Sequence, residues 1–382
     1  MNGFSLDDDR IAIRDMARAF ADEKIAPHAL EWDEKKHFPV DVIRQTAPLG
    51  MGAIYVREDV GGSALSRFDA ALIFEALATG CPSISAYISI HNMCAWMIDN
   101  FGSDEQRRKF LPPLASMEKL ASYCLTEPGA GSDAAALRTR AIPEGDHYVL
   151  NGQKQFISGA GNERDFYLVM ARTSDAGSKG ISAFMVEGGT AGLKFGANER
   201  KMGWNAQPTR AVIFEDCRVP AANRLGEEGL GFKIAMAGLD GGRLNIGACS
   251  LGGAQSALEK ALAYMSERWA FGKRLDEFQA LQFRLADMAT ELEAARTLLW
   301  RAATALDAKA PDATKLCAMA KRFATDAGFG VANDALQMFG GYGYLADYGV
   351  EKLVRDLRVH QILEGTNEIM RLIVAREMVG RH

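Results

Sequence analysis

The chain has 382 residues, which is more than one hydrophobic core ordinarily holds, so we expect two or three domains or one large composite fold. Hydrophobic residues make up 48% of the sequence and charged residues 24%, both ordinary values for a globular protein. The 44 Lys and Arg and 49 Asp and Glu residues give a net charge of −5, and no basic run stands out. Charge therefore gives no support to nucleic-acid binding.

The cysteines and the first residues bear on the compartment. Six cysteines are dispersed, with no CxxC pair and no histidine at zinc-ligand spacing, so we expect buried free thiols, a reducing compartment and no metal. The first ten residues are acidic and lack both the apolar core of a signal peptide and the basic helix of a transit peptide. We expect a cytoplasmic location, or the mitochondrial matrix if a leader was removed before this numbering begins.

Residues 1–118 have the pattern of a helical domain, in which apolar residues between 11 and 21 roughly follow a helical stripe. Residues 76–98 contain no Asp, Glu, Lys or Arg and so imitate a membrane span. Pro82, His91 and several other polar residues make this stretch unsuited to lipid. We predict a buried helix that begins after Pro82, and no insertion into a membrane.

From about residue 119 to residue 225 the period changes to that of strands. Asn151-Gly152 is a hairpin signal with apolar residues on both sides. Short runs of β-forming residues follow at 166–170, 181–186 and 211–214. This part predicts a small antiparallel barrel or sandwich.

Residues 226–382 return to long helical patterns, interrupted near 271–272, 309–311 and 340–343. Four long helices packed as an antiparallel bundle are expected. The predicted fold class is therefore mainly α with a central β domain. Its domains are an N-terminal helical domain at 1–118, a middle β domain at 119–225 and a C-terminal four-helix domain at 226–382.

Glu364 is the candidate general base. It lies in an apolar stretch, precedes Gly365, and is followed by an amphipathic helix that Thr366 can cap. A helix N-terminus stabilises a carboxylate, whereas apolar neighbours destabilise it and raise its pKa towards neutrality. If burial prevails, Glu364 can abstract a weakly acidic proton. A surface carboxylate in a helix-entry loop is the alternative.

Three segments resemble the signature motifs of the acyl-CoA dehydrogenase family, in the family's order and spacing. They read YCLTEPGAGSD at 123–133, ALQMFGGYGY at 335–344 and QILEGTNEIM at 361–370. The resemblance covers essentially the whole chain and implies the same three domains, with FAD and an acyl-CoA bound where they meet. It implies that Glu364 abstracts the α-proton while the β-hydrogen passes to the flavin, because no side chain accepts hydride. It also implies that the Glu364 backbone N–H and a ribityl hydroxyl of the flavin bind the thioester oxygen.

The resemblance implies a large set of FAD-binding residues, shared between neighbouring subunits of a homotetramer that is a dimer of dimers. The set is Tyr123, Cys124, Leu125, Thr126, Gly129, Gly131, Ser132, Phe156, Ile157, Ser158, Arg268, Phe278, Gln279, Gln337, Met338, Phe339, Gly340, Gly341, Thr366, Asn367 and Glu368. Arg268 would bind the pyrophosphate. Without the resemblance, the glycine-rich segment at residues 128–132 could be an ordinary turn, and Arg268 could be a solvated charge on a helix. Many relatives have Trp where this chain has Phe156.

A second set of residues is implied for the acyl-CoA: Ser132, Asp240, Gly241, Gly242, Arg243 and Arg376. Some relatives carry their base at the position of Gly242, which has no side chain, so Glu364 has no rival. His91 and His360 are expected to be core histidines, because the mechanism needs no second base.

The finer resemblance lies in residues 86–98 and 202–210. It implies a short α-branched substrate, isobutyryl-CoA oxidised to methacrylyl-CoA in valine breakdown, with an electron-transfer flavoprotein as acceptor. Four residues have the bulk to close the acyl pocket: Tyr87, Ile88, Met93 and Trp96. The alternatives are a 2-methylbutyryl-CoA or butyryl-CoA dehydrogenase, a flavin oxidase of the same fold, and a non-enzymatic scaffold.

Overall fold

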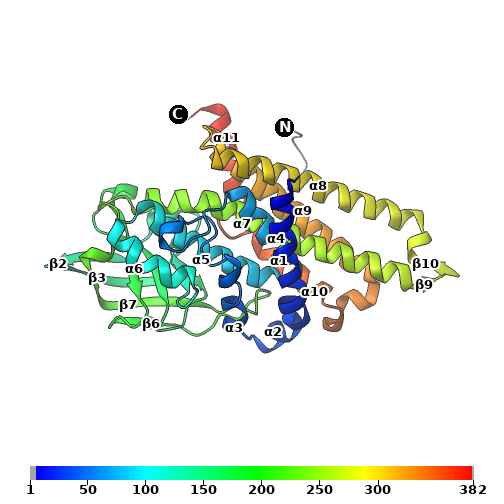
Figure 1. Ribbon diagram of the computed structural model, residues 1–382, viewed down its shortest axis with the longest axis horizontal. Coiled ribbons are helices and arrows are strands. Elements are labelled where there is room, and N and C mark those ends of the chain that lie inside the picture. Colours follow the sequence, from blue (N-terminus) through cyan, green and yellow to red (C-terminus); the bar gives the residue numbers. More distant parts are fainter. Residues whose placement is uncertain (1–5, 381–382) are drawn as a thin grey trace.

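The computed structural model describes residues 6–380, so the first five residues of the acidic N-terminal segment lie outside it, as do residues 381–382. One β-sheet stands in the sequence between two groups of helices, and in space it occupies one end of an elongated molecule (Figure 1). The helices are α1 Asp8–Phe20, α2 Ala29–Lys35, α3 Val40–Arg44, α4 Arg67–Gly80, α5 Pro82–Phe101, α6 Asp104–Ala115, α7 Gly231–Glu267, α8 Gln279–Asp307, α9 Ala313–Phe339, α10 Val350–Arg358 and α11 Asn367–Val379. The strands are β1 Ala121–Cys124, β2 Arg140–Glu144, β3 His147–Ser158, β4 Phe166–Arg172, β5 Ile181–Glu187, β6 Leu193–Phe195, β7 Thr209–Pro220, β8 Arg224–Leu225, β9 Trp269–Ala270 and β10 Lys273–Arg274.

Local sequence signals set the starts of the N-terminal helices. The side chain of Asp7 caps α1 by accepting a hydrogen bond from the Arg10 backbone N–H at 2.9 Å. Ser66 and Asp69 form a capping box at the start of α4. Pro82 lies in the first turn of α5, and most of that helix is buried, which confirms the predicted buried helix. No helix within residues 6–380 is long and apolar enough to span a membrane.

The cysteines and the two singled-out histidines belong to the core, as expected. All six cysteines are buried and free. His91 is fully buried, where its Nε2 lies 3.0 Å from two backbone carbonyl oxygens and its Nδ1 accepts from the Ala121 N–H at 3.1 Å. His360 accepts from the Trp204 indole N–H at 3.2 Å. Burial lowers the pKa of His91 to about 4 and that of His360 to about 3, so both rings are neutral at physiological pH.

The sheet has eight strands in the order β6-β7-β3-β2-β4-β5-β8, and β1 pairs with β4 in parallel. The order has two ends, so among the described residues the sheet does not close into the barrel that the sequence left open as one possibility. The end strands β6 and β8 have three and two residues, and each pairs on one side only, with β7 and β5.

The predicted hairpin at Asn151-Gly152 is wrong. Both residues lie inside β3, which pairs with β7 before and after them, with a register shift between Leu150 and Gly152. Gly152 has φ +144°, and a Cβ at this position would lie 2.6 Å from the Oγ1 of Thr139. The extra residue at this irregularity is on β7, where Glu215 and Asp216 stand opposite Asn151. The glycine serves a close approach to Thr139 rather than a turn.

Helix α7, with 37 residues, packs against α4 and α5 of the N-terminal group and against α8 and α9. Helices α8 and α9 are also long, whereas α10 and α11 have nine and 13 residues. The predicted four long helices are thus three long helices and two short ones. The last predicted helix is interrupted because the backbone leaves helical geometry at Gly349 (φ +70°), before α10, and at Gly365 (φ +89°), before α11.

Small residues let α7 approach its neighbours closely. A Cβ on Gly252 would lie 2.0 Å from the backbone oxygen of Glu75 on α4, which a methyl group cannot do without moving one of the two helices. Glu75 is also bonded through its carboxylate to Arg296 of α8 at 2.8 Å. The three helices are therefore held at a spacing that glycine permits.

We expect Gly252→Ala to lower the free energy of unfolding by about 1–3 kcal/mol, because the added methyl group must separate α4 from α7. Thermal unfolding followed by circular dichroism measures the change. Gly330→Ala on α9 is the matched control, since a Cβ there meets no atom within 4 Å and alanine favours a helix by up to about 1 kcal/mol. Equal melting temperatures for Gly252→Ala and the wild type would contradict the close packing.

Candidate active site

A cavity of about 310 Å³ opens where β1, β3 and the start of α7 meet α5 and the loop before α11. Apolar side chains form much of its wall: Ile90, Met93, Leu125, Ile157, Trp204, Phe232, Met236, Leu239, Leu363 and Ile369. Its polar groups include Glu364, Arg243, Tyr123 and Ser132. An apolar cleft with a few convergent polar groups is the usual form of a small-molecule site.

Glu364 is the carboxylate whose environment is most perturbed in this cavity. It has φ +53°, a left-handed conformation that costs a non-glycine residue about 1–2 kcal/mol. The residue is half-buried, but its Oε2 is fully buried and has no hydrogen-bond partner among residues 6–380. Burial raises the pKa of Glu364 to about 7, and the positive charges of Lys321 and Arg243 limit this rise. A carboxylate of this pKa is matched to proton abstraction at neutral pH.

The backbone N–H of Glu364 is a second free polar group. It donates no hydrogen bond to any group of the described chain. A ligand carbonyl that enters the cavity can therefore meet a donor and a base from the same residue.

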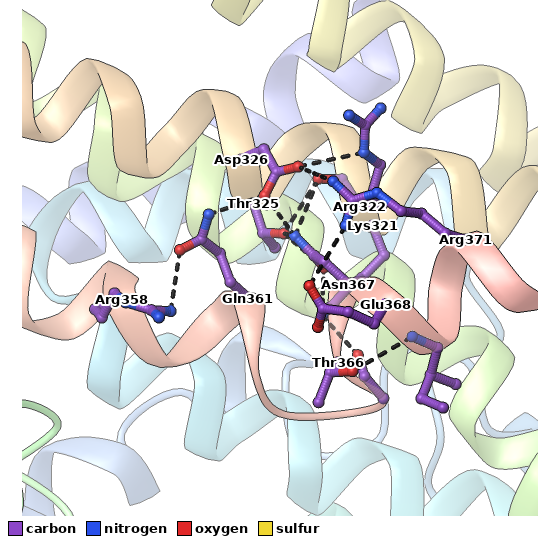
Figure 2. Close-up of polar contacts among 12 residues, drawn as sticks. Lys321, Arg322, Thr325, Asp326, Arg358, Gln361, Thr366, Asn367, Glu368 and Arg371 are labelled. Atoms are coloured by element: carbon purple, nitrogen blue, oxygen red, sulfur yellow. Dashed lines mark hydrogen bonds and ion pairs between the residues drawn. The ribbon is translucent and has the colours of Figure 1, made fainter. Parts of the chain in front are cut away.

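The loop that carries Glu364 is joined to α11 and α9 (Figure 2). Thr366 caps α11 as predicted, because its Oγ1 accepts from the Ile369 N–H at 3.3 Å. The Asn367 side chain donates to the Thr325 Oγ1 at 2.9 Å and to the Asp326 Oδ1 at 2.6 Å, both on α9. Neither residue is in the cavity wall, and Glu368 is exposed. In a single chain Thr366 and Asn367 fix the loop, and none of the three residues lines the cavity.

Position 242 on α7 faces the same point as Glu364. A Cβ on Gly242 would lie 1.9 Å from the Oε2 of Glu364 and 2.9 Å from the Sδ of Met93. A side chain at position 242 and the present Glu364 carboxylate therefore exclude one another. The glycine keeps the carboxylate's place open.

The other predicted substrate positions divide into two groups. Arg243 lines the cavity with Ser132, and its Nη1 donates to the Asp240 Oδ1 at 2.5 Å. Gly241 faces away, towards the guanidinium of Arg67. Arg376 lies on the exposed part of α11 and is not in the cavity wall.

The structure gathers eight predicted FAD positions around the cavity: Tyr123, Leu125, Thr126, Gly131, Ser132, Phe156, Ile157 and Ser158. They come from the end of β1 with the loop after it and from the end of β3, and the Gln155 N–H joins the two segments by donating to the Thr126 oxygen at 2.8 Å. Strand alternation turns Cys124 into the core of the sheet. Gly129 also lies outside the cavity wall.

The remaining predicted FAD positions lie elsewhere. Arg268 and five C-terminal residues, Gln337, Met338, Phe339, Gly340 and Gly341, line an open depression of about 480 Å³. Phe278 and Gln279 lie at the start of α8, next to the β9–β10 hairpin. Figure 1 shows this hairpin at the opposite end of the long helices from the sheet. One chain does not bring the two groups of positions together.

Of the four residues predicted to close an acyl pocket, only Met93 lines the cavity. Tyr87 and Ile88 are fully buried in the core, and the Tyr87 hydroxyl donates to the Ala121 oxygen at 3.3 Å. Trp96 packs its ring against the Arg67 guanidinium at 4.6 Å. The prediction failed for these three residues because the size of a side chain does not indicate which side of a helix faces the cavity.

Sequence analysis missed several cavity residues. Ile90 lies one helical turn before Met93 on α5, and Phe232, Met236 and Leu239 follow one another along the face of α7 that also carries the predicted Arg243. That helical spacing is the signal that would have found them. Trp204 enters from an irregular segment before β7 and has no such signal.

The groups around the cavity fit a flavin. The Tyr123 hydroxyl is buried and has no hydrogen-bond partner within residues 6–380, as is true of the Glu364 Oε2. A Cβ on Gly131 would meet no atom within 4 Å, so the backbone of this loop is open to a ligand. Phe156 has φ +59°, and its exposed side chain borders the cavity. Apolar walls with free polar groups suit a flat ring whose edges form hydrogen bonds.

Comparison with known proteins agrees with this geometry. Three family models match: "Acyl-CoA dehydrogenase, N-terminal domain" at residues 7–118, "middle domain" at 122–217 and "C-terminal domain" at 229–379. The chain is 58% identical to "Isobutyryl-CoA dehydrogenase, mitochondrial" of Bos taurus and 59% identical to that of Dictyostelium discoideum. Each match covers 98% of this chain and 90% of the relative.

Solved structures are also similar. Butyryl-CoA dehydrogenase from Megasphaera elsdenii has a TM-score of 0.95 and 40% identity, over 99% of this chain and 100% of that one. A chain in a structure titled for the electron transferring flavoprotein of Acidaminococcus fermentans has a TM-score of 0.96 and 43% identity, over the same shares. The FAD complex of PigA has a TM-score of 0.94 and 31% identity, again over 99% and 100%. The chain belongs to the acyl-CoA dehydrogenase family, whose members are FAD-dependent.

Proposed function

We propose that this chain oxidises isobutyryl-CoA to methacrylyl-CoA, a step of valine breakdown, and passes the electrons to an electron-transfer flavoprotein. The observation that carries the reaction is the buried, unpartnered Oε2 of Glu364 in a largely apolar cavity. The two relatives named for isobutyryl-CoA, at 58% and 59% identity, support the acyl group. The similar chain in the structure titled for an electron transferring flavoprotein supports the acceptor.

Glu364 is the proposed catalytic base. With a pKa of about 7, a substantial fraction of the side chain is ionised at neutral pH and can take the α-proton of the thioester. The free N–H of Glu364 would donate to the thioester oxygen and stabilise the charge that develops there. FAD, when bound, supplies the acceptor for the β-hydrogen.

The cavity wall supports a short acyl group. Gly242 leaves room for the Glu364 carboxylate, and the Sδ of Met93 borders the same point. Leu239 and Leu363 also line the cavity, and their bulk would limit the length of an acyl chain. A compact, branched acyl group fits these boundaries better than a long straight chain.

We assign the flavin ring to the eight predicted FAD positions that line the cavity, which lie between Tyr123 and Ser158. We assign the FAD pyrophosphate to Arg268 of a neighbouring copy. The separation of the two groups along the long helices supports sharing, because one chain cannot offer both to one cofactor. Arg268 lies over the Tyr342 ring at 5.3 Å, and Gly340 and Gly341 leave open space above the same depression. A homotetramer built as a dimer of dimers would supply the neighbouring copies.

Glu364→Gln should lower turnover by at least about a hundredfold, because the amide keeps the size of the side chain but cannot accept the proton. Steady-state oxidation of isobutyryl-CoA with an artificial electron acceptor measures it, and the flavin content should stay normal. Glu105→Gln is the control, since Glu105 is an exposed carboxylate on α6 that lies outside the cavity wall. Near-wild-type turnover of Glu364→Gln would remove Glu364 as the base.

The kcat/KM values for four acyl-CoAs test the substrate. Isobutyryl-CoA should rank first, and 2-methylbutyryl-CoA and butyryl-CoA should be slower but detectable, because one methylene in an apolar pocket is worth about 1–3 kcal/mol. Octanoyl-CoA should be nearly inert, since its chain would have to displace packed side chains. A higher value for butyryl-CoA or octanoyl-CoA refutes the assignment, and stoichiometric peroxide without an added acceptor would favour an oxidase.

Arg268→Ala should weaken FAD retention and oligomer stability together, because a cofactor stabilises the state that binds it. Flavin absorbance measures FAD retention, and size-exclusion chromatography with thermal melts measures oligomer stability. Arg274→Ala in the same hairpin is the control, because Arg274 is exposed and bonded to Asp276 at 3.1 Å. A monomeric Arg268→Ala that holds FAD as tightly as the wild type would rule out the shared site.

A further inference from the structure

Lys321 is a fully buried lysine on α9 that lies under the loop carrying Glu364. Its Nζ donates to the backbone oxygen of Gly365 at 2.8 Å and to the Oδ1 of Asn367 at 2.9 Å. Both acceptors are neutral oxygens of residues just after Glu364, and Figure 2 shows Lys321 reaching Asn367 from the helix above. Burial lowers the pKa of Lys321 to about 8, so the buried ammonium is costly. A lysine at this place needs a reason beyond packing, since an apolar side chain would fill the same volume.

The loop that Lys321 contacts has an unfavourable backbone. Glu364 and Gly365 are consecutive residues with positive φ, +53° and +89°. A left-handed glutamate persists only where the surrounding structure restrains it. Of the two oxygens that accept hydrogen bonds from Lys321, that of Gly365 is the nearer in sequence to Glu364. This bond fixes the direction of the Gly365 carbonyl group.

Helix α9 also restrains the loop at both of its ends, through Gln361 and Asn367. The Asp326 Oδ1 accepts from Gln361 at 2.8 Å, before the loop, and from Asn367 at 2.6 Å, after it. Thr325 accepts from the same Asn367 amide at 2.9 Å. Figure 2 shows these contacts converging from one helix on both ends of the loop. Lys321 supplies the contact next to the base itself.

We infer that Lys321 is a positioning residue for Glu364: it clamps the Gly365 oxygen so that the carboxylate stays in the cavity, and its charge stabilises the ionised base. The inference rests on Glu364 acting as the base of the proposed reaction. The two roles are separable, because one depends on the geometry of the donor and the other on the charge.

Within residues 6–380, two cations among the surrounding titratable groups act on the Glu364 carboxylate. The others are neutral groups from four elements or loops, and burial raises the pKa of each: Tyr55 in the segment before α4, Cys94 on α5, Tyr123 on β1 and Cys249 on α7. The charged groups are Lys321 on α9 and Arg243 on α7, which both hold the pKa of Glu364 down against burial. Removing the charge of Lys321 therefore raises the pKa of Glu364, and a higher pH is needed to ionise the base.

Lys321→Met and Lys321→Arg, each purified with FAD, test the two roles. In Lys321→Met, kcat for isobutyryl-CoA should fall about ten- to a hundredfold at pH 8, because a loosened base is misplaced. The acid limb of its kcat/KM profile should move up by as much as about one pH unit. Lys321→Arg should keep the position of the limb but recover only part of kcat, because the planar guanidinium cannot repeat both bonds of the ammonium.

Lys201→Met is the matched control. Lys201 also has a pKa lowered by burial to about 8, and its Nζ also donates to a backbone oxygen, that of Gln207 at 2.7 Å, and to a hydroxyl, that of Thr209 at 2.8 Å. Loss of this lysine should leave the acid limb in place. A limb that moves equally in Lys201→Met and Lys321→Met would overturn the inference, as would wild-type kcat and profile in Lys321→Met.

Hydrogen–deuterium exchange separates this inference from the proposed function. The peptide covering residues 361–367 should exchange faster in Lys321→Met than in the wild type, and no faster in Lys201→Met. If the wild type turns over no acyl-CoA, the proposed function fails, and exchange still reports whether Lys321 holds the loop. If exchange in this peptide is unchanged in Lys321→Met, the clamp is refuted whatever the activity.

Discussion

An ionised carboxylate that loses water without gaining a hydrogen bond is unstable, and the Glu364 Oε2 is in this situation. The surrounding structure has to compensate for it. Burial raises the pKa of Glu364 to about 7, while Lys321 and Arg243 keep it from rising further. Gly242 has no side chain to displace the carboxylate, whose Oε2 lies where a Cβ at this position of α7 would meet it at 1.9 Å. The features of the site thus follow from keeping one base reactive and in place.

The helices that hold this base come from distant parts of the sequence. Helix α7 brings Gly242 and Arg243, α9 brings Lys321, and the sheet brings the loop after β1. Glycines such as Gly252 allow α7 to contact the N-terminal helices closely enough to form one core. The same long helices separate the cavity from the Arg268 depression, so their length bears on assembly as well as on the site (Figure 1).

Much of the fold was predictable where the determining interactions are local. The buried helix after Pro82, the Thr366 cap and the strand runs depend on a few consecutive residues, and each was confirmed. Asn151-Gly152 misled because glycine permits a positive φ both in a turn and inside a strand, and only the pairing of β3 with β7 distinguishes the two cases. The open sheet and the two short C-terminal helices likewise depend on contacts between distant segments.

By itself, the sequence determined the family, the order of helical and β parts, and the identity of the candidate base, because these are written in short motifs such as the one around Glu364. Only the tertiary structure decided which residues meet. It joined Lys321 to Gly365, 44 positions later, and placed Arg376 away from the cavity. It also perturbed the pKa of Glu364, since desolvation is the sum of everything packed around the group. A motif names the reactive residue, but its environment is a property of the folded chain.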